Sequence, residues 1–268
     1  MKNTYFTSTG VEVKNRSFLM GDSIQVSFFI RNSQIVLAED CYFFLMASMR
    51  KMRMNIPLSY TLEFFQNLLT EKIIEGEKVE NAIVRFVVYR NSDITDLAKA
   101  SVSYFFDYSI FDDILTVQGS QELDLIKEIN VNNNLLSNIK THCPENIYAE
   151  IYALENDLDD VILLNPNKRI ARSIYGNLLF LEGNVVKVVK QAEGAYISPL
   201  LESFVTFMHK NNLAELQESE IIAFETQKAE EILLISDEKG IFSVSKIRNK
   251  SFANTRFAEM INQWKQSF

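Results

Sequence analysis

One lysine stands out among the residues of this chain that could do chemistry. Lys140 lies in the segment LLSNIKTHCPENIYAEIYALENDLDDVILLN, residues 135–165, just ahead of a predicted helix and a predicted strand. A lysine beside apolar chain is either a solvated turn residue or a buried amine whose lowered pKa permits Schiff-base chemistry. The other residues and the elements that position them decide between these two interpretations.

Few other side chains suggest a reaction or a metal. The 268 residues include only two histidines, His142 and His209, and two cysteines, Cys41 and Cys143. These residues show no Cys/His ligand spacing, so we expect no metal site. Two cysteines are also too few for a disulfide framework, which favours a cytoplasmic location in a reducing compartment.

The composition argues against several classes of partner. Hydrophobic residues make up 47% and charged residues 23% of the chain, as in an ordinary soluble globular protein. The formal net charge of −8 and the pI near 5.0 argue against nucleic acid or an anionic membrane as partner. The start, MKNTYFTSTG, lacks the apolar core of a signal peptide. No apolar run approaches the ~18 residues needed to span a bilayer.

The first part of the chain predicts a small α+β domain with the order strands, helices, strands. The predicted strands are residues 23–31, 34–37, 82–90 and 100–108, and the predicted helices are residues 38–54 and 59–75. The polar stretch TVQGSQ, residues 116–121, is the best boundary. We therefore assign residues 1–118 to a small N-terminal domain and residues 119–268 to a larger C-terminal domain that carries Lys140.

The second part predicts a strand-rich α+β domain. Its first helix spans residues 145–156 and has Ile147, Ile151 and Leu154 on one stripe, and a later hairpin turns through Gly183. The other predicted elements are strands in 160–165, 169–189, 231–236 and 241–247, and helices at 198–212 and 255–266.

Five segments carry a resemblance to a known family. They are NRSFLMGDSIQVSFFIRNSQIVLAEDCYFFLMASMRKMRMNIP, VRFVVYRN, LLSNIKTH, YALENDLDDVILLNPNKRIARSIYGNLLFLEGNVVKV and AEEILLISDEKGIFSVSKIRNKSF. In this order, over nearly the whole chain, they resemble class IV aminotransferases, the family of branched-chain aminotransferases and aminodeoxychorismate lyases. The resemblance implies the two-domain fold type IV of pyridoxal-phosphate enzymes (D-amino-acid aminotransferase-like), a pyridoxal-phosphate cofactor and a homodimer. It also places Lys140 at the Schiff-base position.

The positions that hold the cofactor's phosphate in this family carry other residues here. An arginine of the family's first helix corresponds to Phe44, which has no donor to offer. A glycine-isoleucine-threonine turn at a helix N-terminus corresponds to SPL, where Ser198 is the expected N-cap and Pro199 has no N–H. A hydroxyl-rich turn corresponds to Ser236, and we interpret Asp237 and the glutamate after it as a solvated acidic turn.

Arg172 occupies the position where the family places a glutamate against the pyridine nitrogen. That glutamate keeps the nitrogen protonated, so that the ring can act as an electron sink. A guanidinium cannot accept the hydrogen bond and would leave the pyridine neutral. By family position, Arg172, Ser198 and Ser236 are the candidate cofactor-binding residues, and Lys140 is the candidate catalytic residue. The other interpretation of Arg172 is a surface-facing strand residue paired with a nearby acid.

Three functions are compatible with these residues. The first is a pseudoenzyme or binding protein that keeps the class IV fold but does not hold pyridoxal phosphate in the usual way. The second is an active but atypical pyridoxal-phosphate aminotransferase or aminodeoxychorismate lyase that uses Lys140. The third is Schiff-base chemistry by Lys140 without a cofactor. The replacements at Phe44, Arg172, Pro199 and Asp237 favour the first.

Overall fold

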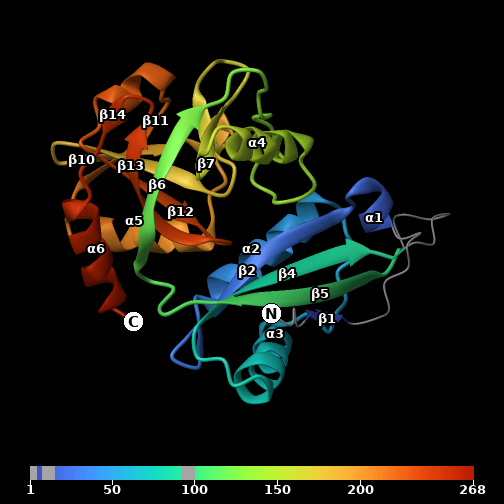
Figure 1. The fold of residues 1–268 in the computed structure, drawn as a ribbon. Helices are drawn as coiled ribbons and strands as arrows, with labels where there is room; N and C mark the ends of the chain where they lie inside the picture. The colour runs from blue at the N-terminus through green and yellow to red at the C-terminus, as the bar shows by residue number, and fades with distance from the viewer. Residues whose placement is uncertain (1–4, 8–15, 92–99) are drawn as a thin grey trace. The chain divides into compact units, whose positions relative to one another are not determined.

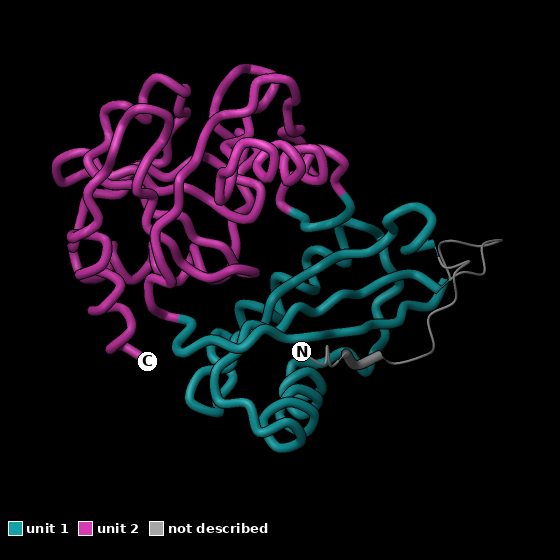
Figure 2. Tube along the Cα trace, viewed as in Figure 1, with its two compact units in different colours: residues 1–114, 139–142 teal, residues 115–138, 143–268 magenta. Residues whose placement is uncertain are grey.

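The computed structural model describes residues 5–7, 16–91 and 100–268, which form two compact units. Unit 1 comprises Met1–Ile114 together with Ile139–His142, and unit 2 comprises Leu115–Asn138 and Cys143–Phe268 (Figure 2). The return segment, residues 139–142, therefore places Lys140 in unit 1. The sequence put the boundary after residue 118 and Lys140 in the second domain, and that division into domains stays a prediction.

Unit 1 is built on a five-stranded antiparallel sheet in the order β1-β5-β4-β2-β3 (Figure 1). The strands are β1 (Tyr5–Thr7), β2 (Ser23–Arg31), β3 (Gln34–Val36), β4 (Ala82–Arg90) and β5 (Val102–Ile110). The helices are α1 (Arg16–Met20), α2 (Ala38–Lys51), α3 (Leu62–Leu69) and the π-helix η1 (Thr70–Gly76).

The two faces of this sheet differ in chemistry, because successive strand residues point to opposite sides. On one face, Ile24, Val26 and Phe28 of β2 are buried. Phe28 stacks on Phe65 of α3 with ring centroids 5.9 Å apart, so this face packs against the helices. The opposite face carries the alternate, mostly polar residues of β2, and we call it the polar face.

Unit 2 is built on a nine-stranded mixed sheet in the order β11-β10-β9-β12-β13-β6-β7-β8, with β14 beside β13. Its strands are β6 (Val117–Leu125), β7 (Asp160–Leu164), β8 (Ile170–Ser173), β9 (Asn177–Glu182), β10 (Val185–Val189), β11 (Glu215–Ser219), β12 (Glu231–Ser236), β13 (Gly240–Ile247) and β14 (Lys250–Ser251). Its helices are α4 (Pro144–Glu155), α5 (Pro199–Lys210), α6 (Thr255–Lys265) and the 3-10 helices η3 (Gln191–Glu193) and η4 (Ala223–Gln227).

Buried side chains from several strands of unit 2 form one apolar core, to which Ile162, Phe180 and Leu234 contribute. The helices α5 and α6 lie next to each other (Figure 1), and Phe204 meets Trp264 with ring centroids 5.2 Å apart. The mixture of helices and strands in both units confirms the predicted α+β class.

Local signals placed most elements correctly. Strands β2, β4 and β12 have the predicted bounds, and the hairpin β9–β10 turns through Gly183, whose φ is 57°. The predicted helix 59–75 begins later, at Leu62, because Thr61 caps it by accepting a hydrogen bond from the Phe64 amide at 3.1 Å. It also ends as the π-helix η1 rather than as an α-helix.

The apolar stripe predicted on the first helix of unit 2 exists but faces outward. Ile147, Ile151 and Leu154 of α4 are 49%, 51% and 78% exposed. The buried residues of α4 are Ala149 and Ala153, which belong to a small apolar cluster with residues of β7. Two alanines let the helix approach the strand closely, so the larger side chains remain on its outer side. No helix in the described ranges has the length and apolar character needed to cross a membrane.

Candidate functional site

The backbone around Lys140 is held against β2. The Gln25 amide donates to the Lys140 carbonyl at 2.8 Å, which makes an isolated antiparallel bridge between the two residues. The Thr141 hydroxyl donates to the Ser23 carbonyl at 2.6 Å. Lys140 itself is half-buried. The lysine is therefore fixed as an extra strand residue of unit 1, which differs from the solvated turn residue that the sequence left open.

A glycine makes this arrangement possible. Gly21 precedes β2 with a φ of +65°, and a Cβ added there would lie 2.2 Å from the His142 Cβ. A residue with a side chain would be strained at that φ and would also push against the return segment. The position of Lys140 thus depends on a residue far away in sequence.

Arg172 lies in β8 and is bonded to neutral groups. Its Nη1 donates to the carbonyls of Ser173 at 2.8 Å and Ile174 at 3.2 Å. Its Nη2 donates to Asn146 Oδ1 at 2.7 Å and lies 3.8 Å from Cys143 Sγ. Burial lowers the pKa of Arg172. Among the described residues no carboxylate pairs with its guanidinium, so the alternative of a surface arginine paired with an acid is wrong.

Ser236 ends β12 and has three backbone partners. Its hydroxyl donates to the Tyr175 carbonyl at 2.8 Å. The same oxygen accepts from the amides of Glu238 at 3.2 Å and Lys239 at 3.0 Å. The side chain is fully buried. The hydroxyl and the two amides of this turn are thus already bonded to one another.

Ser198 and Asp237 form the second contact of this region. The Ser198 hydroxyl donates to Asp237 Oδ1 at 2.5 Å, and the two residues are 1% and 8% exposed. Ser198 is the N-cap of α5 but makes no side-chain capping bond to its own helix, which starts with Pro199. The interpretation of Asp237 as part of a solvated turn is therefore wrong. The charge-assisted hydrogen bond from Ser198 and the positive end of the α5 helix dipole stabilise the Asp237 carboxylate in this buried position.

Together, Tyr175, Ser198, Ser236 and Asp237 form what we call the turn cluster. Phe44, the remaining family position, lies in α2 and is only half-buried, whereas Cys41 one turn earlier is fully buried. Phe44 therefore does not belong to the buried core of its helix.

Asp160 was missed by sequence reasoning because nothing distinguishes it from Asp157 and Asp159. It begins β7 and is fully buried, and burial raises its pKa to about 6. Its Oδ1 accepts from the amides of Val161 at 2.7 Å and Ile174 at 3.0 Å, which holds the connection after Arg172. Its Oδ2 is buried and has no hydrogen-bond partner among the described residues.

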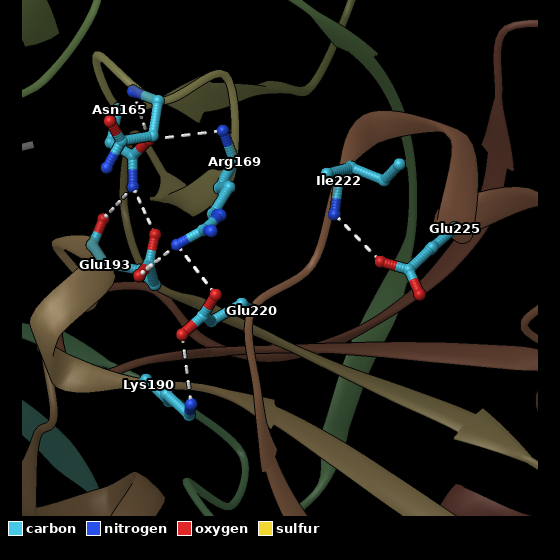
Figure 3. Close-up of polar contacts among 8 residues, drawn as sticks. Asn165, Arg169, Lys190, Glu193, Glu220, Ile222 and Glu225 are labelled. Carbon is cyan, nitrogen blue, oxygen red and sulfur yellow. Dashed lines mark hydrogen bonds and ion pairs between the residues drawn. The ribbon is translucent and has the colours of Figure 1, made fainter.

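A second polar network of unit 2 is structural (Figure 3). Asn165 Nδ2 donates to Glu193 Oε2 at 2.7 Å, and Arg169 Nη1 contacts Glu193 at 3.1 Å and Glu220 at 2.7 Å. Lys190 donates to Glu220 at 3.2 Å, and this bond and the charge of Arg169 lower the pKa of Glu220. The polar groups of this network are bonded to one another, and we therefore assign them the structural role of joining the loops that carry them. In the described part of the chain no group of three His, Cys, Asp or Glu residues could hold a metal.

Comparison with known proteins identifies the family. The sequence profile of amino-transferase class IV matches residues 27–247. No curated protein sequence matches this chain. Similar solved structures include a candidate 4-amino-4-deoxychorismate lyase from Legionella pneumophila, at 17% identity, a TM-score of 0.85, and coverage of 97% of this chain and 96% of that chain.

Two further structures are branched-chain aminotransferases. The protein from Thermoproteus uzoniensis is 15% identical, with a TM-score of 0.86 and coverage of 98% of this chain and 93% of that chain. The Escherichia coli enzyme is 12% identical, with a TM-score of 0.83 and coverage of 97% and 92%. At these identities the structures show the fold, and they confirm the two-domain class IV fold. Because the family profile covers most of the sequence, the chain belongs to the class IV aminotransferase family.

Proposed function

We propose that this chain is a class IV aminotransferase-like protein that does not hold pyridoxal phosphate in the family's usual way and acts as a pseudoenzyme or binding protein. One observation carries the proposal. The polar groups of the turn cluster, which occupies the family's phosphate-binding positions, bond to one another: Ser198 to Asp237, and Ser236 to Tyr175 and two turn amides.

The residues present do not fit the cofactor's phosphate. A phosphate dianion at the start of α5 would meet the buried Asp237 carboxylate, and like charges at contact distance repel strongly where water is excluded. It would also have to displace Ser236 from the amides of Glu238 and Lys239, because a buried amide needs an acceptor. Pro199 has no N–H to offer in compensation.

The residues also do not fit the cofactor's ring. Arg172 stands at the position of the family's glutamate and uses both terminal nitrogens to donate to oxygen atoms of the protein. A donor at this position cannot accept the proton of a pyridinium. These contacts support a protein in which the ring would lose the carboxylate that keeps its nitrogen protonated as well as its phosphate anchor.

The alternative is an active but atypical pyridoxal-phosphate aminotransferase or aminodeoxychorismate lyase. The return segment favours it, because Lys140 keeps the Schiff-base position of the family and its backbone is bonded to β2. An enzyme of this kind would need a different phosphate anchor from the turn cluster.

Borohydride trapping separates the two functions. The purified protein is mixed with pyridoxal phosphate, reduced, and digested for mass spectrometry, with Lys140→Arg as the matched control. We expect a colourless protein, no stoichiometric pyridoxyl adduct at Lys140, and no gain in melting temperature with the cofactor. A yellow protein with one adduct per chain, lost in Lys140→Arg, would overturn the proposal in favour of the alternative.

We also propose that the protein is a cytoplasmic homodimer. The resemblance to the family supports two subunits, and Cys41 and Cys143 are both free thiols, as suits a reducing compartment. Light scattering during size-exclusion chromatography should give twice the chain mass of 30.9 kDa. A mass of one chain across the accessible concentration range would contradict the dimer.

A further inference from the structure

The outer face of α4 is apolar although it is exposed. Ile147, Ile151 and Leu154 recur at the spacing i, i+4 and i+7, so they form one stripe along the helix, and they are 49%, 51% and 78% exposed. Tyr148 beside them is 48% exposed. Single exposed apolar residues are ordinary in soluble proteins, but a continuous stripe on one helix indicates a surface that another element covers.

The carboxyl end of α4 is negative. Glu155 is the last residue of the helix and Asp157 follows it closely, and both side chains are exposed. Neither forms an ion pair within the described ranges, and the last turn of α4 contains no basic residue. A carboxylate at this end lies beside the negative end of the helix dipole, which is unfavourable unless a cation is near. The α4 face therefore lacks both an apolar cover and a positive charge.

The outer face of α2 carries the opposite charge at its end. Phe43, Ala47 and Arg50 are exposed at the same spacing of i, i+4 and i+7, and Phe43 is 63% exposed. Arg53, just after the helix, is exposed as well. In the part of the chain that the structure describes, neither arginine has an ion-pair partner. This face therefore offers an aromatic side chain followed by two cations.

The two faces match in length, in spacing and in charge. Each stripe extends over two turns of its helix, about 10 Å at a rise of 1.5 Å per residue. When α2 and α4 lie with their carboxyl ends on the same side, the two arginines of α2 meet Glu155 and Asp157. Phe43 then contacts the apolar stripe, and aromatic side chains are frequent anchors of protein interfaces. Both faces are exposed in the single chain, so the match is available to a second molecule.

We propose that α2 of one copy of this chain packs against α4 of a second copy. A twofold axis makes this contact twice, so each copy uses both faces. Two α4 faces against each other would bring carboxylates together, and two α2 faces would bring arginines together, so like charges disfavour both arrangements. A basic segment of another protein would cover α4 but leave the α2 face exposed. The inference rests on the homodimer proposed above and gives that dimer a contact surface.

Ile151→Asp tests the apolar stripe. It puts a charge in the middle of a contact that occurs twice in the dimer, so the dissociation constant of the dimer should rise at least about 100-fold. Light scattering over a dilution series of the full chain measures this constant. Phe224→Asp is the matched control, because Phe224 is an apolar residue of η4 that is 70% exposed, and this variant should dimerise like wild type.

Charge reversal tests the pairing of the two faces. Arg50→Glu and Glu155→Lys each set like charges against each other in both contacts, and each should raise the dissociation constant at least about 10-fold. In an equimolar mixture, the two reversed charges face each other in one contact and two native charges in the other, so a dimer should form again. Isotope labelling of one variant identifies this mixed dimer by native mass spectrometry. Glu155→Lys also removes an anion from the negative end of the α4 dipole, so its dissociation cannot come from a weakened helix.

Three outcomes would overturn this inference. A dimer that withstands Ile151→Asp, or single charge variants that dimerise like wild type, would rule out this surface and leave the homodimer standing. Charge variants that dissociate but do not recombine when mixed would mean that another surface or another protein covers α4. A wild-type chain that stays monomeric contradicts the homodimer as well. A stoichiometric pyridoxyl adduct at Lys140, by contrast, bears on the proposed function alone and is measured separately.

Discussion

The turn cluster of unit 2 and the polar face of unit 1 treat buried polar groups in opposite ways. In the turn cluster, Ser198 and Ser236 are bonded to Asp237 and to the backbone. On the polar face, Gln25 Nε2 and the Tyr89 hydroxyl are buried without partners in the described chain. A group already bonded inside the protein must lose that bond before it can hold a ligand. The difference therefore teaches that binding capacity follows unsatisfied groups, and family position alone is a poor guide to it.

Asp160 should give the largest effect. One oxygen of its carboxylate accepts hydrogen bonds from two backbone amides, and the other is buried without a partner among the described residues. Its pKa is raised from 3.8 to about 6 in the folded protein. Between these values the folded state keeps a proton that the unfolded state releases, so stability falls as pH rises through this window, by at most about 3 kcal/mol. Urea unfolding at intervals from pH 4 to pH 7 should show this slope, and Asp160→Asn should remove it. Equal slopes in both proteins would show that the Asp160 carboxyl does not keep its proton in the folded state over this pH range.

Ser236→Ala tests the bonded side of the comparison. The substitution leaves the Tyr175 carbonyl and two turn amides without the hydroxyl, and we expect a loss of about 2 kcal/mol. Ser245→Ala is a matched control and should cost about half as much, because within the described ranges the Ser245 hydroxyl makes one hydrogen bond, to the Gln121 carbonyl at 3.1 Å. Equal losses in chemical denaturation would indicate that the turn amides find other acceptors.

Ser198→Ala should have a smaller effect, of about 1–2 kcal/mol, because it removes one charge-assisted bond to the buried Asp237 carboxylate. Ser198→Thr keeps the hydroxyl and should retain most of the stability. Denaturant midpoints of the two variants decide this. If the alanine variant is as stable as wild type, the Ser198–Asp237 contact does not hold the start of α5.

Gln25→Met should have the smallest effect, within about 0.5 kcal/mol, because it replaces an amide whose nitrogen has no partner among the described residues by an apolar group of similar length. The measurement is the same denaturant midpoint without added ligand. A loss as large as that of Ser236→Ala would abolish the contrast between the two regions.

The sequence predicted the fold well where the signal is local. Runs rich in β-branched and aromatic residues defined β2 and β4, and Gly183 marked the turn between β9 and β10. The helical spacing of apolar residues in α4 showed which residues share a face, but it did not show which face packs against the sheet. Ala149 and Ala153, which are small enough for close approach to β7, decided that.

The candidate site was predictable only in part. The resemblance identified Lys140 and Arg172, but the contacts that define Arg172 come from Cys143 and Asn146, far earlier in the chain. The burial of Asp237 depends on Ser198, which is equally remote. The unpaired groups of the polar face depend on strand register, which the sequence pattern of single strands does not reveal.

The return segment, residues 139–142, has a consequence for synthesis on the ribosome. Unit 1 is discontinuous, because its last residues follow a stretch of 24 residues, Leu115–Asn138, that belongs to unit 2. Domains tend to fold as units when their residues have emerged from the ribosome. The first sheet can form from residues up to 114, but Lys140 joins β2 only when the beginning of unit 2 has also been made. The return segment is thus the last part of unit 1 to arrive, and a nascent chain stalled before it would present the polar face without the Lys140 amine.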